Sequence, residues 1–390
     1  MTSTRVRVIL GAVAAAGLIL ALTSCAPAVA LHHGGGGHHS AGPTSTPTPT
    51  PTPTVSTLDT TAPTPLANID CSKFVTQAQL TAAFGNTAVT AVQTPAIATG
   101  DLKNQNAYIP AMDYVRATGG ITCLWSNAPV NYYYTSSANG GFPPYKTIQI
   151  SVLFHAQPLW PTVEDVEGVT GDYGVGSCDI GSCELDEYIG GSMWMNATEL
   201  NQLSSPNDPF SDIISAVKSD LLAAGAVGPD PTPAAGTLPI GHSCTDFVAN
   251  ADASTALGGT PVVSVQPIKQ QDDIDFYGIW SGAQDALGAH PCEWKRGSAV
   301  VGHLSWLAGG AWAWNEAQAL PYLGSPAQPL AIPGLPNGDS AFIRCTAGDS
   351  SCVADLILGG NWIETQVAQP GATNRAAVTA VAAAIVTKVG

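Results

Sequence analysis

Apolar residues recur at helical spacing near the end of each half of the chain. The first stripe follows Asp208 and Pro209, an N-cap residue and a proline at the first helical position, and the second begins at about Asn374. Residues three or four apart share one face of a helix, so both stripes predict amphipathic helices that each close a domain. The apolar positions are Phe210, Ile213, Ile214, Val217, Leu221 and Leu222 in the first stripe, and Val378, Val381, Ile385 and Val389 in the second.

Upstream of each closing helix, apolar residues alternate with polar ones or are β-branched, which is typical of strands. Residues 145–154, "YKTIQISVLF", and 298–310, "SAVVGHLSWLAGG", are the clearest examples, and clusters of Gly, Pro and Asn separate such runs. Thr76 and Gln79 have the spacing of a capping box, which predicts an early helix with Gly85 as its stop. A helix, several antiparallel strands and a second helix together predict an α+β domain.

The two halves of the chain repeat the same landmarks in the same order. "CSKFVTQAQLTAAFG" corresponds to "CTDFVANADASTALGG", "TCLW" to "PCEW", and "CDIGSCELDEYIGGSMW" to "CTAGDSSCVADLILGGNW". Such self-similarity indicates a tandem duplication. The sequence therefore predicts a first α+β domain over residues 67–227, a Pro/Gly linker over 228–240 and a second domain over 241–390. Each is expected to hold an antiparallel sheet flanked by an N-terminal and a C-terminal helix, stapled by disulfides.

The cysteines of each copy are expected to form two disulfides. Four cysteines permit three pairings, and the repeat narrows the choice because both copies should make the same bonds. Trp125 and Trp294 each follow a cysteine by two residues, so they should lie on the same face of a strand and cover the bond there. Neither short cysteine pair has the spacing of a redox Cys-x-x-Cys motif or of a structural zinc site. The predicted pairs are Cys71–Cys123, Cys178–Cys183, Cys244–Cys292 and Cys345–Cys352.

Residues 1–24 are typical of a bacterial lipoprotein signal peptide. Their apolar run, 8–22, is shorter than the roughly 20 residues that a membrane-spanning helix needs. It ends in "LTSC", which resembles a lipobox, so Cys25 is predicted to receive a diacylglyceryl group and to begin the mature chain. Ordinary cleavage at residues 28–30, "AVA", and an uncleaved anchor are the alternatives. Nine cysteines are present, and lipidation of Cys25 leaves an even eight for pairing.

The net charge disfavours two classes of partner, nucleic acids and anionic bilayers bound through a polybasic patch. The 390 residues include 13 Lys plus Arg against 29 Asp plus Glu, a net charge of −16, which becomes −18 when Arg5 and Arg7 leave with the leader. Nucleic acids require clustered cations, and so does adhesion to an anionic bilayer through a polybasic patch. No basic run exists in the chain. The 45% of hydrophobic residues supports packed cores instead.

Residues 25–66 read as a tether. A Thr-Pro alternation over 43–54 favours extended polyproline-like chain, and its composition also suggests O-glycosylation. Four histidines flank a run of four glycines and are weak candidates for zinc, nickel or copper binding. The competing interpretation is a solvated hinge, because flexible glycines deny a metal its fixed geometry. The four are His32, His33, His38 and His39.

These features together resemble a family of small actinobacterial cell-envelope lipoproteins. The resemblance rests on the opening Cys-Ser-x-Phe-Val-Thr, the helix ending in Phe-Gly or Leu-Gly, the Cys-x-Trp, the lipobox and the Thr/Pro tether. It covers the first half of each domain well and the second half loosely, and the tandem arrangement departs from the family's usual single domain. It implies an outer-face, lipid-anchored location, with no established activity or catalytic residues.

Aromatic residues are the candidate contacts of a non-catalytic binding protein. Trp312 and Trp314 are two apart, which would place them on one side of a strand beside Trp306, and residues 132–134 lie in a Gly/Asn/Pro-rich insertion that the second copy lacks. Core packing and a partnerless hairpin are the respective alternatives. We expect an extracytoplasmic lipoprotein that binds an envelope protein or a small ligand, without a cofactor. The insertion contributes Tyr132, Tyr133 and Tyr134.

Two further hypotheses are kept open. An envelope enzyme with one active copy, for instance a hydrolase, would need a nucleophile and base, but no common catalytic motif is present and the histidines do not recur between copies. Calcium could bind the acidic turn "DIGSCELDE", although no EF-hand spacing exists and a solvated acidic turn competes. The histidines are His155, His242, His290 and His303; the acids are Asp179, Glu184, Asp186 and Glu187, with Asp349 and Asp355 in the second copy.

Overall fold

The fold was obtained as a computed structural model. It describes residues 61–67, 69–85, 88–92, 109–127, 146–162, 175–179, 181–202, 210–225, 227–266, 278–318, 326–371 and 373–390. All of these belong to one compact unit, residues 54–390. The leader, Cys25, the four histidines of the tether and Tyr132–Tyr134 lie outside the described residues.

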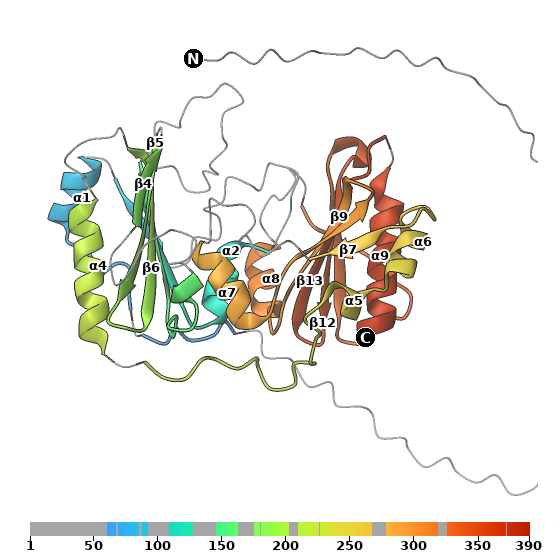
Figure 1. Ribbon diagram of the computed structural model, residues 1–390, viewed down its shortest axis with the longest axis horizontal. Helices are drawn as coiled ribbons and strands as arrows, with labels where there is room; N and C mark the ends of the chain where they lie inside the picture. Colours follow the sequence, from blue (N-terminus) through green and yellow to red (C-terminus); the bar gives the residue numbers. More distant parts are fainter. Residues whose placement is uncertain are drawn as a thin grey trace, which may run out of the picture. The chain divides into compact units, whose positions relative to one another are not determined.

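The first repeat contains a six-stranded antiparallel sheet (Figure 1). Its strand order places the Cys-x-Trp strand, β2, between the short edge strand β1 and β3, while the two strands of the Gly-Gly hairpin, β5 and β6, lie beyond β3. In spatial order the strands are β1 (Thr90–Val92), β2 (Ile121–Ser126), β3 (Thr147–Leu153), β6 (Met193–Gln202), β5 (Gly181–Ile189) and β4 (Val175–Asp179).

The second repeat builds its sheet in the same spatial order and adds one strand. That order is β7 (Val263–Val265), β8 (Cys292–Arg296), β9 (Ala299–Leu307), β13 (Asn361–Val367), β12 (Cys352–Leu358), β11 (Ser340–Cys345) and the added β10 (Gln328–Pro329). All neighbouring pairs are antiparallel. The predicted α+β class, with two tandem copies of a disulfide-stapled domain, is confirmed.

In the first repeat, α1 (Gln77–Phe84) and α4 (Ser211–Ala224) cover one face of the sheet (Figure 1). The predicted capping box at Thr76 is present, and the helix ends at Gly85, whose φ of 74° favours glycine. Phe84 packs edge-on against Phe210 with 5.3 Å between ring centroids. Helix α4 begins at Ser211, so the predicted start at Pro209 is wrong: Phe210 occupies the N-cap and buries its ring in the core instead.

The matching face in the second repeat is covered by α5 (Cys244–Phe247), α6 (Asn250–Ala256) and the long closing helix α9 (Asn374–Val389) (Figure 1). Helix α9 buries the predicted stripe through Val378, Val381 and Ile385. A side chain of α6 also reaches the edge strand β7. The side chain of Asn250 accepts the backbone N–H of Ser264 at 3.0 Å, which protects an otherwise open sheet edge.

Three further helices were not predicted: α2 (Ala111–Ala117), α7 (Ile279–Leu287) and α8 (Ala311–Ala317). Helices α2 and α7 precede the Cys-x-Trp strands of the two repeats and contact each other. Helix α7 also contacts β3 and β6 of the first sheet, and it comes so close that a Cβ on Gly282 would lie 2.5 Å from the ring of Trp194. One hydrophobic cluster consequently runs from Tyr114 and Trp194 of the first repeat into the core of the second.

The linker 228–240 is attached to both repeats. Its Asp230 contacts Nδ1 of His155 at 2.6 Å, and Pro231 packs where a Cβ on Gly119 would lie, both in the first repeat. Farther along, the backbone N–H of Leu238 donates to the carbonyl of Gly359 in the second repeat at 2.9 Å. The segment therefore straps the two repeats together and does not simply space them apart.

Candidate functional site

The two long-range disulfides occupy equivalent places in the two repeats. Cys71 is bonded to Cys123 with 5.5 Å between Cα atoms, and Cys244 to Cys292 with 5.9 Å, as the repeat predicted. All four side chains are buried, and the tryptophans two residues farther along each strand, Trp125 and Trp294, are buried with them. The Cys-x-Trp motif is thus a structural element of each core, because residues two apart on a strand face the same layer.

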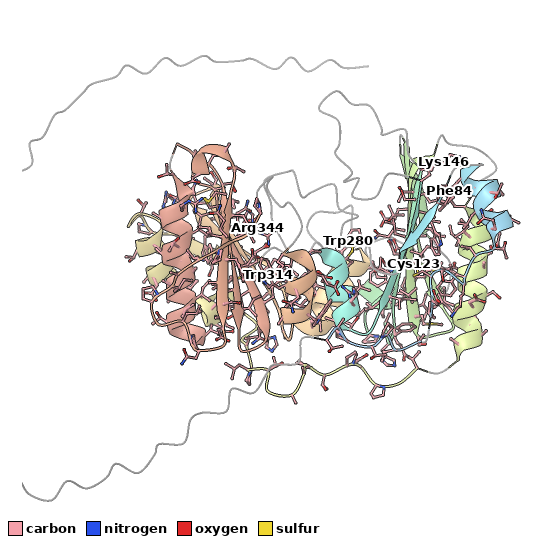
Figure 2. All side chains as sticks on the ribbon, turned by 180° about the vertical axis from the view of Figure 1, so that it is seen from behind. Phe84, Cys123, Lys146, Trp280, Trp314 and Arg344 are labelled. Carbon is pink, nitrogen blue, oxygen red and sulfur yellow. A yellow bond between two sulfur atoms is a disulfide. The ribbon has the colours of Figure 1, made fainter. Side chains whose placement is uncertain are left out.

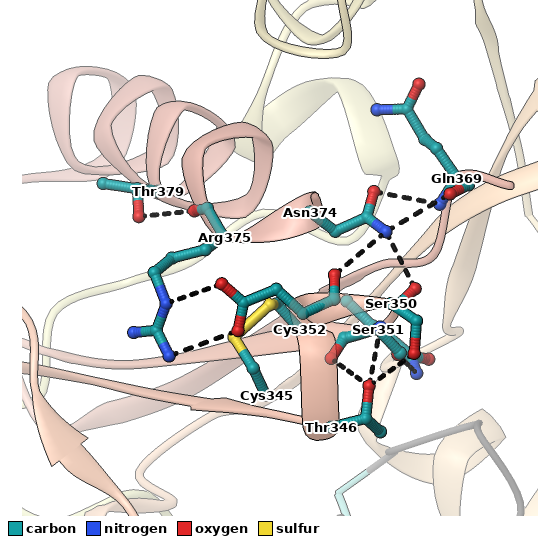
Figure 3. The surroundings of a disulfide bond; sticks show 11 residues. Cys345, Thr346, Ser350, Ser351, Cys352, Gln369, Asn374, Arg375 and Thr379 are labelled. Carbon is teal, nitrogen blue, oxygen red and sulfur yellow. Dashed lines mark hydrogen bonds and ion pairs between the residues drawn. A yellow bond between two sulfur atoms is a disulfide. The ribbon is translucent and has the colours of Figure 1, made fainter. Parts of the chain in front are cut away.

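A third disulfide joins Cys345 to Cys352, which face each other on β11 and β12 (Figure 3). Asn374, at the start of α9, donates to the carbonyl of Ser350 at 2.8 Å and so ties the helix to this turn. The side chain of Asp349 lies near both sulfur atoms, but sulfurs bonded to each other offer no thiolate to a metal ion.

The fourth predicted pair, Cys178 and Cys183, can be followed only through the backbone. The two residues are direct partners in the register of β4 and β5. Their side chains lie outside the described residues, so this bond stays a prediction.

Carboxylates of the acidic turn proposed for calcium bind other side chains of the protein. Asn196 donates to Glu184 at 2.7 Å and to Asp186 at 3.0 Å, and Glu187 forms an ion pair with Lys218. In the second repeat Asp349 pairs with Arg375 and Asp355 with Arg344, while the side chain of Asp179 lies outside the described residues. These contacts leave the calcium hypothesis without support in the part of the chain described.

The tryptophans proposed as binding contacts are buried, so they do not form an exposed surface. Trp306 packs against Phe247 with 4.6 Å between centroids. The expectation that Trp312 and Trp314 share one side of a strand is wrong. Both lie in α8, where residues two apart point in different directions, and they consequently meet different partners.

Trp314 and its neighbours reveal an aromatic arrangement that both repeats share. Trp314 packs edge-on against Trp362 at 5.5 Å, and in the first repeat Trp160 packs edge-on against Trp194 at 6.1 Å. Trp362 and Trp194 are the tryptophans of the two Gly-Gly-(x)-x-Trp motifs. Trp314 is therefore the counterpart of Trp160 and a core residue.

Each of these motif tryptophans donates its indole N–H to a buried aspartate. Trp194 donates to Asp186 at 2.6 Å, and Trp362 donates to Asp355 at 3.0 Å. We did not single out this pair from the sequence, although its signal is present: both repeats contain Asp-x-x-x-Gly-Gly before the tryptophan. The positive φ of Gly359 and Gly360, 52° and 86°, suits the tight two-residue turn that brings the two strands together.

In the second repeat this aspartate belongs to a buried polar cluster, which is the candidate site. Asp355 lies opposite Glu364 in the strand register, and Glu364 lies opposite Ser305. Arg344 donates to Asp355 at 3.2 Å and lies over the ring of Trp314, 4.8 Å from its centroid (Figure 2). None of the four polar side chains is more than 3% exposed.

Tyr114 of the first repeat reaches the same cluster. Its hydroxyl is buried near Ser305 and Gln284 but makes no hydrogen bond of normal geometry, and one oxygen of Glu364 and the hydroxyl of Ser305 are likewise unpaired. Burial raises the pKa of Tyr114, and the carboxyl of Glu364 raises it further. Polar groups from both repeats therefore lie together in one buried cluster.

The electrostatics of the cluster follow from burial of two acids beside one base. Burial raises the pKa of Glu364 well above its usual value, and the neighbouring Asp355 adds to the shift. Burial also raises the pKa of Asp355, against the lowering effect of Arg344. Ionising both carboxyls would leave a net negative charge in a low-dielectric setting, which is costly.

A second polar contact between the repeats lies on α2 and α8. Arg116 forms two hydrogen bonds with Glu316, at 2.8 and 3.1 Å, and a third with Asp113 at 3.1 Å. Its guanidinium carbon lies 4.4 Å from the centroid of the Trp312 ring. Burial raises the pKa of Asp113 to about 7, although the charge of Arg116 lowers it.

No helix in the described ranges has the length and apolarity required to cross a bilayer. Comparison of the chain with protein families, curated proteins and solved structures finds no match. The resemblance to envelope lipoproteins accordingly stays an expectation, and the functional argument rests on the residues themselves.

Proposed function

We propose that the protein is a lipoprotein of the outer face of the cell membrane, held by a diacylglyceryl group on Cys25. The cysteine inventory carries this proposal. Six of the nine cysteines are paired in disulfides, and Cys178 faces Cys183 across two strands. Stable disulfides are typical of exported proteins, and Cys25 in its lipobox is then the one cysteine left over.

The test is the mass of the mature N-terminus. In a lipoprotein-processing bacterial host, the membrane fraction should yield a chain that begins at Cys25 and carries the mass of the acyl chains. Cys25→Ser should remove that mass and release the protein, and Ser24→Ala, which keeps a small residue before the cysteine, serves as the matched control. An acyl-free chain beginning at Leu31, after ordinary cleavage, would refute the lipid anchor.

We further propose that the two fused repeats act as a binding module for an envelope protein or small ligand. Two observations support this proposal. The repeats form one compact double unit, joined by a shared core and by the linker, and the first repeat has an insertion with tyrosines at 132–134 that the second lacks. Loop aromatics on a rigid scaffold are common recognition residues.

Crosslinking of the anchored protein in intact envelopes tests the binding role. A partner that is recovered from wild type but lost from a variant with Tyr132, Tyr133 and Tyr134 changed to Ser supports it. The control changes Tyr188, whose hydroxyl donates to the carbonyl of Gly191 within the fold, to Phe. Equal recovery from all three proteins would exclude the tyrosines as the contact.

A further inference from the structure

The two repeats differ at one buried position, which holds an amide in the first repeat and an ionisable carboxyl in the second. In the first repeat Asn196 lies opposite Asp186, two residues after the motif tryptophan, and its amide donates to that aspartate at 3.0 Å. In the second repeat the same position, opposite Asp355, is held by Glu364. Where the first repeat has a permanent hydrogen-bond donor, the second has a group that donates only when it is protonated.

The surroundings of Glu364 supply one positive charge for two acids. Arg344 on β11 is hydrogen-bonded to Asp355, and both side chains are at most 2% exposed. Glu364 itself is 2% exposed. One ionised carboxylate balances Arg344, whereas a second would be an unpaired charge in the core.

No further base contacts the pair in the described part of the junction. Helix α2 faces it with Tyr114 and, nearby, Asp113; α7 brings Gln284; α8 brings Trp314. Strand β9 places the neutral Ser305 opposite Glu364. His303, two residues before Ser305 on the same strand, lies opposite Gln366, and burial lowers its pKa. The remaining cation, Arg116, is engaged by Glu316 and Asp113.

We propose that Asp355 and Glu364 share one proton in the folded protein at neutral pH, and that this proton is an alkaline-sensitive latch at the junction of the two repeats. Protonated Glu364 donates to Asp355 as Asn196 donates to Asp186. Loss of the proton converts the donor into a second anion close to Tyr114, which is the contribution of the first repeat to the cluster. Alkaline conditions should therefore loosen the packing of Tyr114 against Ser305 and Glu364 of the second sheet.

The experiment uses the full chain with its disulfides intact. Unfolding is measured in denaturant between about pH 8 and about pH 9, above the range in which normal acids and histidines titrate. If the folded state holds one extra proton, the unfolding equilibrium constant of wild type should rise by up to about tenfold per pH unit. Glu364→Gln, a neutral donor of the same shape, should abolish this rise. Glu316→Gln, the same change on a half-exposed acid outside the pair, should keep it.

A second experiment detects the protonated carboxyl directly. Infrared spectra of the folded protein at about pH 8 should contain the carbonyl band of a protonated carboxyl, and Glu364→Gln should lack it. Absence of that band from wild type, or an equal pH slope in Glu364→Gln, would overturn the proposal. If Glu364→Gln fails to fold, carboxyl-carbon NMR of labelled glutamate and aspartate in wild type decides: signals of Glu364 and Asp355 that are both in the ionised position at about pH 8 refute the shared proton.

Discussion

Arg116 of the first repeat lies over the indole ring of Trp312 of the second, and the same guanidinium binds both carboxylate oxygens of Glu316. This contact is a polar link between the two repeats. The side chain of Arg116 is only 13% exposed and that of Asp113 only 9%, so the charges of this pair are poorly screened, whereas Glu316 is 44% exposed.

Replacing Arg116 with Ala should lower the free energy of unfolding by about 2–4 kcal/mol, because Asp113 must then be protonated or remain an uncompensated buried charge, and because the stacking on Trp312 is lost. Denaturant unfolding of the full chain measures this loss. Arg375→Ala is the control: its ion pair with Asp349 is half-exposed and should contribute about 0–1 kcal/mol. Similar losses for the two variants would show that the junction is not held by this contact.

The disulfides should contribute unequally to stability. Removing Cys71–Cys123 by double alanine substitution frees a loop with a sequence separation of 52, against 7 for Cys345–Cys352. The loop-entropy relation gives about 4 kcal/mol for the long loop and about 2.5 kcal/mol for the short one. Denaturation midpoints of the two double variants should follow this order, and the reverse order would mean that strain or residual structure outweighs loop entropy.

The attachment of the linker to the second repeat can be tested at Gly359. A Cβ there would lie 2.4 Å from Cδ1 of Leu238, in addition to the cost of a φ of 52°. Gly359→Ala should therefore lose about 1–3 kcal/mol more than Gly297→Ala, where φ is 62° and nothing lies within 4 Å of the added carbon. Leu238→Ala should recover part of the difference. Equal losses at both glycines, measured by thermal unfolding, would mean that Leu238 does not pack there.

Asp113 should make the protein less stable as the pH rises from about 4 to about 7. Its folded pKa of about 7 exceeds the value of an unfolded aspartate, so the folded state binds the extra proton in this window and loses the advantage across it. Asp113→Asn cannot titrate, and its unfolding constant should rise more slowly with pH, by up to about tenfold per unit. Above about pH 7 the two profiles should run parallel; parallel profiles throughout would contradict the raised pKa.

Local and covalent signals in the sequence were sufficient for much of the fold. The capping box at Thr76, the stripe of α9 and the pairing of Cys71 with Cys123 all follow from short-range geometry or from the duplication, and the structure contains them. The short helix α8 was mistaken for a strand because "AWAW" alternates small and large residues, and seven residues are too few to distinguish the two periods.

The sequence alone determined that the chain contains two copies of one domain, with cysteines and tryptophans at matching positions. Only the tertiary structure decided how the copies use the positions at which they differ. Glu364 meets Asp355 through strand register, while Tyr114 arrives from a helix more than two hundred residues away in the chain. Burial then raises the pKa of Glu364, because Arg344 can balance the charge of only one of the two buried carboxylates.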